Sequence, residues 1–195
     1  MSNFLLKDIN SVFIHIPKTA GTSIRSGFFK NNYSGPEFGR IPKEWEGLFK
    51  FAFVRNPFER LISAWFMFVS GTSQLDATDY PKYNLKQFLE IVMDESIIYD
   101  ERRKTVKERI RHHTIPLTHP FNCLHLADFV GRYENLDEDF RHICKAVSYP
   151  YKPLPKRHFS EHLHYSTYYD DKTRSMAEDF YSEDLRRLDY SFERQ

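Results

Sequence analysis

The segment from Val12 to Phe29, VFIHIPKTAGTSIRSGFF, constrains the fold more than any other stretch of this chain. Residues 11–16 are β-rich and almost continuously apolar, which is typical of a buried strand in a parallel sheet. After the short loop PKTAG, Ile24, Phe28 and Phe29 recur at helical spacing. The pattern therefore predicts a strand, a tight loop and a helix in direct succession.

The loop between that strand and that helix carries the residues expected of an anion site. Backbone N–H groups at a helix start converge on one point, where the helix dipole favours negative charge. Gly21 lets the backbone approach closely, and Thr22 and Ser23 add hydroxyl donors. Lys18 adds a mobile positive charge, but it precedes the glycine, unlike the lysine of the GxxxxGK[ST] loop of nucleotide hydrolases. We expect a phosphate or sulfate site here; the alternative is a tight turn with a solvated lysine.

A second motif, FVRNPFERLISAW, follows another apolar stretch at residues 49–54. Asn56 and Pro57 are typical of a helix start. If the two strands are parallel, Arg55 lies at the same sheet edge as the first loop. With Ser63, two helical turns further on, its guanidinium can bind a second phosphate. The alternative is that Arg55 pairs with a carboxylate and Ser63 packs in the core.

The rest of the chain alternates between strand and helix patterns. The periodicity predicts helices at 83–94 and 136–147, a short strand at 127–133, and mostly helix over the last forty residues. Residues 150–162 are a loop with three prolines. This alternation predicts an α/β fold, a three-layer parallel sheet flanked by helices, in a single domain over residues 1–195.

Composition and charge narrow the possible partners. The net charge is +1, and no basic stripe is interleaved with stacking residues, so we expect no nucleic acid partner. The basic run 101–113 is helix or loop, and we interpret it as a solvated face rather than a patch for an anionic saccharide. The nine histidines show no metal-ligand spacing, and no metal is expected. Cys123 and Cys144 are interpreted as buried free thiols.

No stretch of the sequence predicts a membrane segment. The longest apolar-leaning run, at 61–69, is far shorter than the roughly 18 residues of a span. The first ten residues hold only a three-residue apolar run before Lys7. We therefore expect a cytoplasmic protein without a stable membrane anchor; the oligomeric state stays open.

Together, HIPKTAGTS and FVRNPFERLISAW resemble the two cofactor motifs of sulfotransferases that use 3′-phosphoadenosine-5′-phosphosulfate (PAPS), most closely the group acting on carbohydrates. In that family the first motif holds the 5′-phosphosulfate and the second holds the 3′-phosphate. The resemblance thus implies a sulfotransferase fold related to P-loop NTPases. It assigns Arg55 and Ser63 to the 3′-phosphate, and it assigns to the 5′-phosphosulfate Lys18, Thr19, Gly21, Thr22 and Ser23.

The likeness continues toward the C-terminus. HHTIPLTHPFNCLHLADFVGRYENLDEDF resembles the family's H-x-x-P segment followed by a strand and E-x-L-x-x-D, and residues 168–192 resemble its closing helices. LPKRHFS, at 154–160, lies where relatives have a loop over the nucleotide, which implies contacts from Arg157 and Ser160. His158 replaces the first residue of the family's N-x-S there, which puts its own contact in doubt.

The resemblance also implies an in-line transfer of the sulfuryl group that leaves 3′,5′-bisphosphoadenosine and needs no metal. Lys18 would compensate the charge that builds on the departing phosphate. Many relatives have a histidine or glutamate as general base before the second motif, where this chain has no histidine. Glu37 falls at about that position and is one candidate. His113 of the H-x-x-P segment is the other, although His112 or His119 could equally be the residue meant.

From these observations we expect a PAPS-dependent sulfotransferase that modifies a hydroxyl, with a carbohydrate as the expected acceptor. One alternative is a catalytically silent module that keeps the nucleotide site but has no base. The other is a small NTP-dependent, kinase-like transferase, which would need a Walker lysine after the glycines and a magnesium carboxylate.

Overall fold

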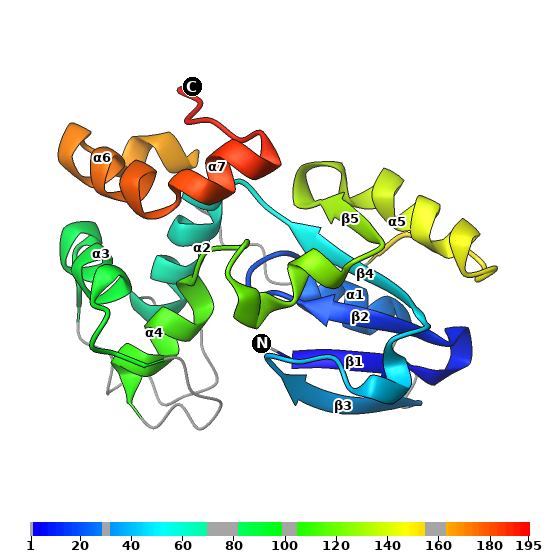
Figure 1. Ribbon diagram of the computed structural model, residues 1–195. Helices are drawn as coiled ribbons and strands as arrows, with labels where there is room; N and C mark the ends of the chain where they lie inside the picture. Colours follow the sequence, from blue (N-terminus) through cyan, green and yellow to red (C-terminus); the bar gives the residue numbers. More distant parts are fainter. Residues whose placement is uncertain (1, 29–31, 70–81, 99–104, 155–162) are drawn as a thin grey trace. The chain divides into compact units, whose positions relative to one another are not determined.

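The computed structural model describes residues 2–28, 32–69, 82–98, 105–154 and 163–195 of the chain (Figure 1). They fall into two compact units. Unit 1 contains Met1–Arg55 and Leu117–Phe159, and unit 2 contains Asn56–Pro116 and Ser160–Gln195. Whether the two units form the single domain expected over residues 1–195 depends on how they are joined. The single domain therefore stays a prediction.

Unit 1 is built on a five-stranded sheet with the strand order β3-β1-β2-β4-β5 (Figure 1). β2, β4 and β5 pair in parallel, whereas β1 runs antiparallel to both β2 and β3. The fold class is therefore confirmed as α/β with flanking helices, but the sheet is mixed rather than wholly parallel. The strands are β1 (Ser2–Leu6), β2 (Ser11–His15), β3 (Tyr33–Phe38), β4 (Phe49–Val54) and β5 (Phe129–Arg132).

The three parallel strands are those that the sequence predicted, whereas β1 and β3 were not anticipated. β1 is only five residues long, and its burial follows no simple alternation. β3 contains Gly35 and Pro36, which disfavour a central strand but are tolerated at the edge of a sheet. β3 itself has no fully buried residue, so its sequence carries a weak strand signal.

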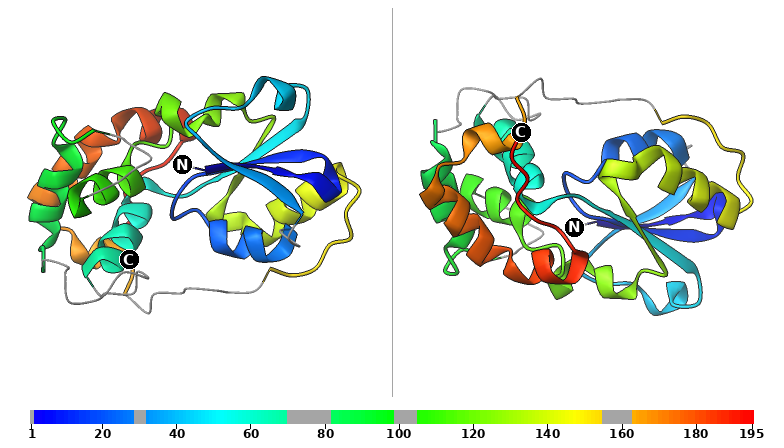
Figure 2. Two further views of the ribbon diagram at one scale, coloured as in Figure 1. Left: turned by 90° about the horizontal axis from the view of Figure 1, so that it is seen from below. Right: turned by 90° about the horizontal axis from the view of Figure 1, so that it is seen from above.

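Two helices cover one face of this sheet (Figure 2). α1 (Gly21–Phe28) and α5 (Leu136–Ala146) share a buried aromatic cluster with the central strands. The ring of Phe28 lies 4.9 Å from that of Phe140 and 5.8 Å from that of Phe51, measured between centroids. The helix expected at 136–147 is thus confirmed, and α1 is fixed directly behind the end of β2.

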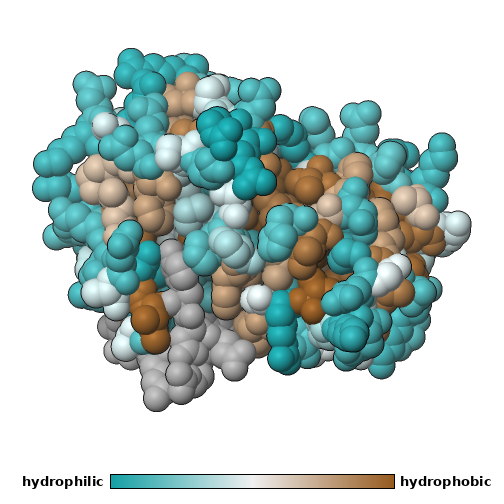
Figure 3. Space-filling view, viewed as in Figure 1, coloured by the Kyte–Doolittle hydropathy of each residue, from teal (hydrophilic) through white to brown (hydrophobic). Residues whose placement is uncertain are grey.

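The same unit contains short 3-10 turns and a partly exposed edge. The turns are η1 (Lys7–Ile9), η2 (Lys43–Trp45), η3 (Pro120–Asn122), η4 (Leu124–Leu126) and η5 (Tyr133–Asn135). At the β5 edge, Leu126 and Val130 leave apolar surface exposed. Figure 3 shows brown, apolar surface over the part of the chain that holds the sheet. η5 follows β5 without a break and proves important for the site.

Unit 2 is a helical assembly with its own apolar core. Its elements are α2 (Pro57–Val69), α3 (Leu85–Met93), α4 (Val106–Thr114), η6 (Tyr165–Tyr168), α6 (Asp171–Phe180) and α7 (Ser182–Leu188). Arg60 is 1% exposed, and its Nη2 donates to the carbonyl of Ile115 at 2.6 Å, which ties α2 to the end of α4. Tyr181 donates its hydroxyl to the Thr114 carbonyl at 2.7 Å.

The helix start read from the sequence at Asn56 and Pro57 is confirmed within this unit. The N–H of Phe58 donates to Asn56 Oδ1 at 3.0 Å, so Asn56 caps α2 as expected. The basic run forms a helix from Val106 onward, and residues 101–104 lie outside the described part of the chain. Of the helices in the described residues, none has the length and apolar character needed to cross a membrane.

Candidate functional site

The loop after β2 has a strained backbone. Lys18 and Ala20, on either side of Thr19, have φ angles of +69° and +71°, in the left-handed region. A residue with a side chain pays about 1–2 kcal/mol there. Turns with left-handed residues also direct successive N–H groups to one side, as in anion-binding nests. Two strained residues in five are therefore consistent with a binding loop, because such strain concentrates at functional sites.

Thr19 holds this loop from the inside. Its side chain is fully buried, and its hydroxyl donates to the carbonyl of Ile16 at 2.9 Å. The hydroxyl proton is thus used within the loop. While that bond is kept, Thr19 can offer only its backbone N–H to an anion, a division of roles that the sequence did not reveal.

The start of α1 supplies donors at the same place. The first helical bond runs from the N–H of Ile24 to the carbonyl of Ala20 at 3.1 Å. The N–H groups of Gly21, Thr22 and Ser23 precede it and have no acceptor within the helix. Thr22 is exposed at this end and Ser23 is buried. The helix start therefore offers backbone donors of the kind that bind an oxyanion, and the anion site expected from the sequence stays a prediction.

Gly21 is required because His15, the last residue of β2, packs against it. A Cβ built at Gly21 would lie 2.1 Å from Nε2 of His15 and 2.3 Å from its Cδ2. The imidazole also lies near the rings of Phe4 and Phe13, at 6.3 and 5.6 Å between centroids. His15 was not singled out in the sequence, where it reads as part of an apolar strand.

Arg55 lies at the same edge of the sheet, as the parallel pairing of β2 with β4 requires. Its side chain is 7% exposed, and Nη1 donates to the carbonyl of Lys18 at 3.2 Å. Its Cζ lies 4.0 Å from the centroid of the Tyr133 ring. The two motifs recognised in the sequence thus meet through a hydrogen bond. Tyr133 was missed, although it follows its strand just as Arg55 does.

The surroundings of Lys18 disfavour its charged form. Burial, and then the nearby positive charge of Arg55, lower the pKa of Lys18 to about 8. An anion bound at the loop would offset both effects, because its charge would compensate the buried ammonium group and screen the repulsion from Arg55. The loop is therefore electrostatically prepared for a negatively charged ligand.

Glu37 lies on β3, opposite Asn3 of β1, which in turn lies opposite Ile14 of β2. β3 runs in the same direction as β2, so Glu37 is near the sheet edge that carries the loop, about 10 Å from the backbone of β2 at the usual strand spacing. Its carboxylate is paired with Arg40 at 2.7 Å, and the side chains are 26% and 73% exposed. Such an exposed pair is worth at most about 1 kcal/mol, so a substrate can displace it.

Two further predicted residues, Ser63 and His113, belong to unit 2. Ser63 lies on α2 and is 7% exposed. Nδ1 of His113, on α4, lies 2.8 Å from the carbonyl of Arg109. A carbonyl only accepts, so Nδ1 carries the proton of the neutral ring and Nε2 carries the lone pair, the form a general base needs. The roles of both residues stay predictions.

Arg157 and Ser160 lie outside the described residues. Within residues 2–28, 32–69, 82–98, 105–154 and 163–195, no three His, Cys, Asp or Glu side chains are grouped as a metal would require. Both cysteines, Cys123 and Cys144, are free and buried, as interpreted from the sequence.

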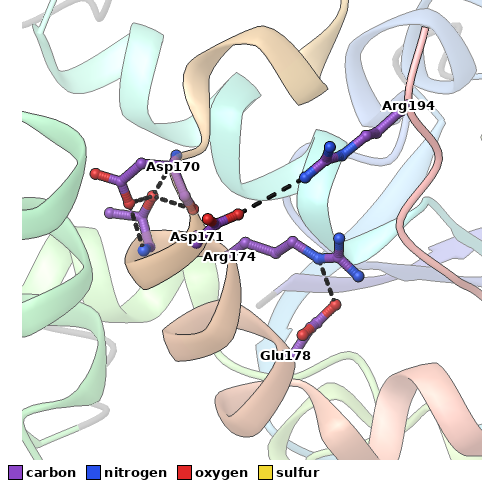
Figure 4. A network of polar contacts seen from close by, with 6 residues as sticks. Asp170, Asp171, Arg174, Glu178 and Arg194 are labelled. Atoms are coloured by element: carbon purple, nitrogen blue, oxygen red, sulfur yellow. Dashed lines mark hydrogen bonds and ion pairs between the residues drawn. The ribbon is translucent and has the colours of Figure 1, made fainter.

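A cavity of about 310 Å³ lies in unit 2, between η6, the start of α6 and the C-terminal residues. Its two arginines are already paired: Arg174 Nε lies 2.8 Å from Glu178 and Arg194 Nη2 lies 3.7 Å from Asp171 (Figure 4). Asp170 also lines it and caps α6 by accepting from the N–H of Thr173. With its charges balanced, this cavity is a poorer anion site than the loop after β2.

We predict that Gly21→Ala destabilises the protein by about 1–3 kcal/mol, because the new methyl group overlaps the His15 ring and forces it out of its packing. Urea denaturation measures the loss. Gly47→Ala is the matched control, since an added Cβ there meets no atom within 4 Å. The double variant His15→Ala/Gly21→Ala should lose less than the sum of the single variants; strict additivity would contradict the overlap.

We predict that Lys18→Met stabilises the ligand-free protein at pH 7 by about 1–2 kcal/mol, because it removes a charge whose burial is unfavourable. The whole pKa shift of Lys18, converted at ~1.4 kcal/mol per pKa unit, would give a larger value. We expect less than that value because solvent screens part of the charge. Below pH 8 the lysine is charged in both the folded and the unfolded state, and the penalty is fully present. Between pH 8 and pH 10.5 the unfolded state binds more protons, so the wild type gains stability and the difference closes. Chemical denaturation from pH 6 to pH 10, with exposed Lys145→Met as control, measures this; a gap that stays constant with pH would contradict it.

The model of the sulfotransferase family matches residues 4–191, almost the whole chain. No curated protein and no solved structure matches the chain. The matched range includes the loop after β2, Arg55 and the whole of the sheet except the first residues of β1. Donors at a helix start, a lysine in a strained loop and an arginine bonded to that loop fit a family of transferases that move sulfuryl groups. The chain belongs to the sulfotransferase family.

Proposed function

We propose that this protein transfers a sulfuryl group from PAPS to a hydroxyl of a carbohydrate acceptor. The observation that carries the proposal is the hydrogen bond between Arg55 and the Lys18 carbonyl, which joins Arg55 to the loop before α1, where its charge also lowers the pKa of Lys18. PAPS has two separate anionic groups. The loop after β2 would bind the 5′-phosphosulfate, and Arg55 with Ser63 would bind the 3′-phosphate.

The role of Lys18 follows from where charge develops in the reaction. The bond between sulfur and the bridging oxygen of the phosphosulfate breaks while a new bond forms between sulfur and the acceptor oxygen. Negative charge therefore grows on the departing phosphate, and an ammonium group held beside it stabilises the transition state more than the ground state. The N–H groups of the α1 start would act on the same oxygens.

The acceptor hydroxyl must lose its proton to a base, and two residues remain candidates. Glu37 lies on a strand that ends at the edge carrying the loop, and its exposed pair with Arg40 is weak enough to be replaced by substrate. His113 carries its lone pair on Nε2 because Nδ1 donates to the Arg109 carbonyl. We place Glu37 first because it shares unit 1 with Lys18.

The carbohydrate part of the proposal rests on the motifs HIPKTAGTS and FVRNPFERLISAW, which most resemble those of carbohydrate sulfotransferases. A sugar offers hydroxyls that can be sulfated and is bound through hydrogen bonds. The cytoplasmic location and the absence of a metal requirement stay predictions from the sequence.

We predict that Lys18→Met lowers kcat for sulfate transfer by a factor of about 100–1,000, because it removes a charge matched to the transition state. Transfer of ³⁵S from labelled PAPS to a glycan panel measures turnover, and exposed Lys145→Met is the control. Calorimetry with 3′,5′-bisphosphoadenosine, in EDTA, measures binding. Near-normal turnover of Lys18→Met would contradict the assignment. Binding without transfer to any glycan would favour the silent module, and Mg²⁺-dependent binding of ATP in its place would favour the kinase-like alternative.

We predict that Glu37→Gln removes the acidic limb of the pH–rate profile together with most of the rate, because a base acts only when deprotonated. His113→Ala should lower the rate less and keep that limb. Arg40→Ala is the control for the ion pair, since it frees the Glu37 carboxylate without removing it. The opposite outcome, with the limb lost only in His113→Ala, would transfer the role to the histidine.

A further inference from the structure

We propose that Tyr133 is a positioning residue whose ring face holds the guanidinium of Arg55. Held in this way, Arg55 supports the Lys18 loop and directs N–H groups toward the nucleotide that carries the sulfuryl group. The inference rests on the proposed function for the identity of the nucleotide. The contact itself belongs to unit 1 and is given by the structure alone.

The sheet places the two residues together. β4 and β5 are parallel neighbours, and their last paired residues are Val54 and Arg132. Arg55 and Tyr133 are the next residue on each strand, so they leave the sheet side by side. The Cζ atom of Arg55 then lies 4.0 Å from the ring centroid of Tyr133, within the range of a cation–π contact.

The position of Tyr133 is set by the two residues that precede it on β5. The N–H of Arg132 donates to Asp139 Oδ2 of α5 at 2.6 Å, which anchors the end of β5. A Cβ on Gly131 would lie 2.6 Å from Cε1 of Phe53, so the absence of a side chain there lets β5 lie close against β4. Tyr133 itself begins η5 and is only half-buried. Its ring is therefore held at the sheet edge rather than inside the core.

An aromatic ring face is better suited than a carboxylate to hold the guanidinium of Arg55 in place. The N–H donors of a guanidinium lie in its plane, whereas an aromatic ring contacts it through the face, so stacking does not use those donors. One of them reaches the Lys18 carbonyl at 3.2 Å. A carboxylate partner would neutralise Arg55 and compete with phosphate for the same donors. The ring holds the cation beside a second cation, Lys18, without cancelling its charge.

The test compares Tyr133→Leu with Tyr133→Phe in calorimetry, using 3′,5′-bisphosphoadenosine and adenosine 5′-phosphate as ligands. Tyr133→Leu should weaken the bisphosphate about tenfold and the monophosphate much less, because only the former has the 3′-phosphate assigned to Arg55. Tyr133→Phe keeps the ring and should restore most of the affinity. In an Arg55→Gln background, Tyr133→Leu should cause no further loss.

Three results would overturn the proposal. Equal losses in Tyr133→Phe and Tyr133→Leu would mean that the hydroxyl, not the ring face, matters. Losses that multiply in the double variant would mean that Tyr133 contacts the nucleotide independently of Arg55. Unchanged affinity in Tyr133→Leu would mean that Arg55 needs no support. Urea denaturation of each variant separates these results from loss of folding.

A second measurement needs no nucleotide and so separates this inference from the proposed function. The rate at which Lys18 is acetylated, followed by peptide mass spectrometry against pH, reports the fraction of neutral amine. Arg55→Gln should raise the apparent pKa of Lys18, Tyr133→Leu should raise it part of the way, and Tyr133→Phe should leave it near the wild-type value. If wild-type protein binds no bisphosphate, the proposed function fails while this titration still decides the role of Tyr133; if Tyr133→Leu leaves the titration unchanged, the positioning role fails.

Discussion

The hydrogen bond from Arg55 to the carbonyl of Lys18 is the interaction on which the rest of the site depends. It exists because β2 and β4 pair in parallel, so the residues after each strand emerge at one edge of the sheet. Through it the second motif supports the backbone of the first. The same contact brings two positive charges close together, and the charge of Arg55 contributes to the lowered pKa of Lys18.

The protein holds that charge with features that each cost stability. Lys18 and Ala20 are in the left-handed region, and the pKa of Lys18 is lowered to about 8. A bound phosphosulfate would relieve the electrostatic part of this cost. The repulsion between the two cations thus becomes preference for an anionic ligand, which is the stability–function compromise usual at binding sites.

The sequence predicted those elements and site residues whose structure depends on neighbouring residues in the chain. β2, β4 and the start of α2 were predicted because apolar runs and the Asn56–Pro57 start carry their structure locally. β1 was missed because its burial follows no simple alternation, and β3 was missed because it contains Gly35 and Pro36, which are tolerated mainly at the edge of a sheet. The hydroxyl bond of Thr19 and the ring of Tyr133 were missed because their partners become neighbours only when the chain folds.

In the proposed reaction the site would meet two kinds of ligand charge: one that is constant, and one that develops only in the transition state. The 3′-phosphate proposed for Arg55 has the same charge in the ground state and the transition state, so Arg55 and the Tyr133 ring behind it contribute uniform binding, which acts on KM. The oxygen that Lys18 would serve gains charge only as the bond to sulfur breaks, so under this proposal Lys18 would act on kcat. Because Arg55 Nη1 is bonded to the Lys18 carbonyl, a phosphate bound by Arg55 would also hold the lysine loop in place, so part of its binding energy would act on kcat in addition to KM.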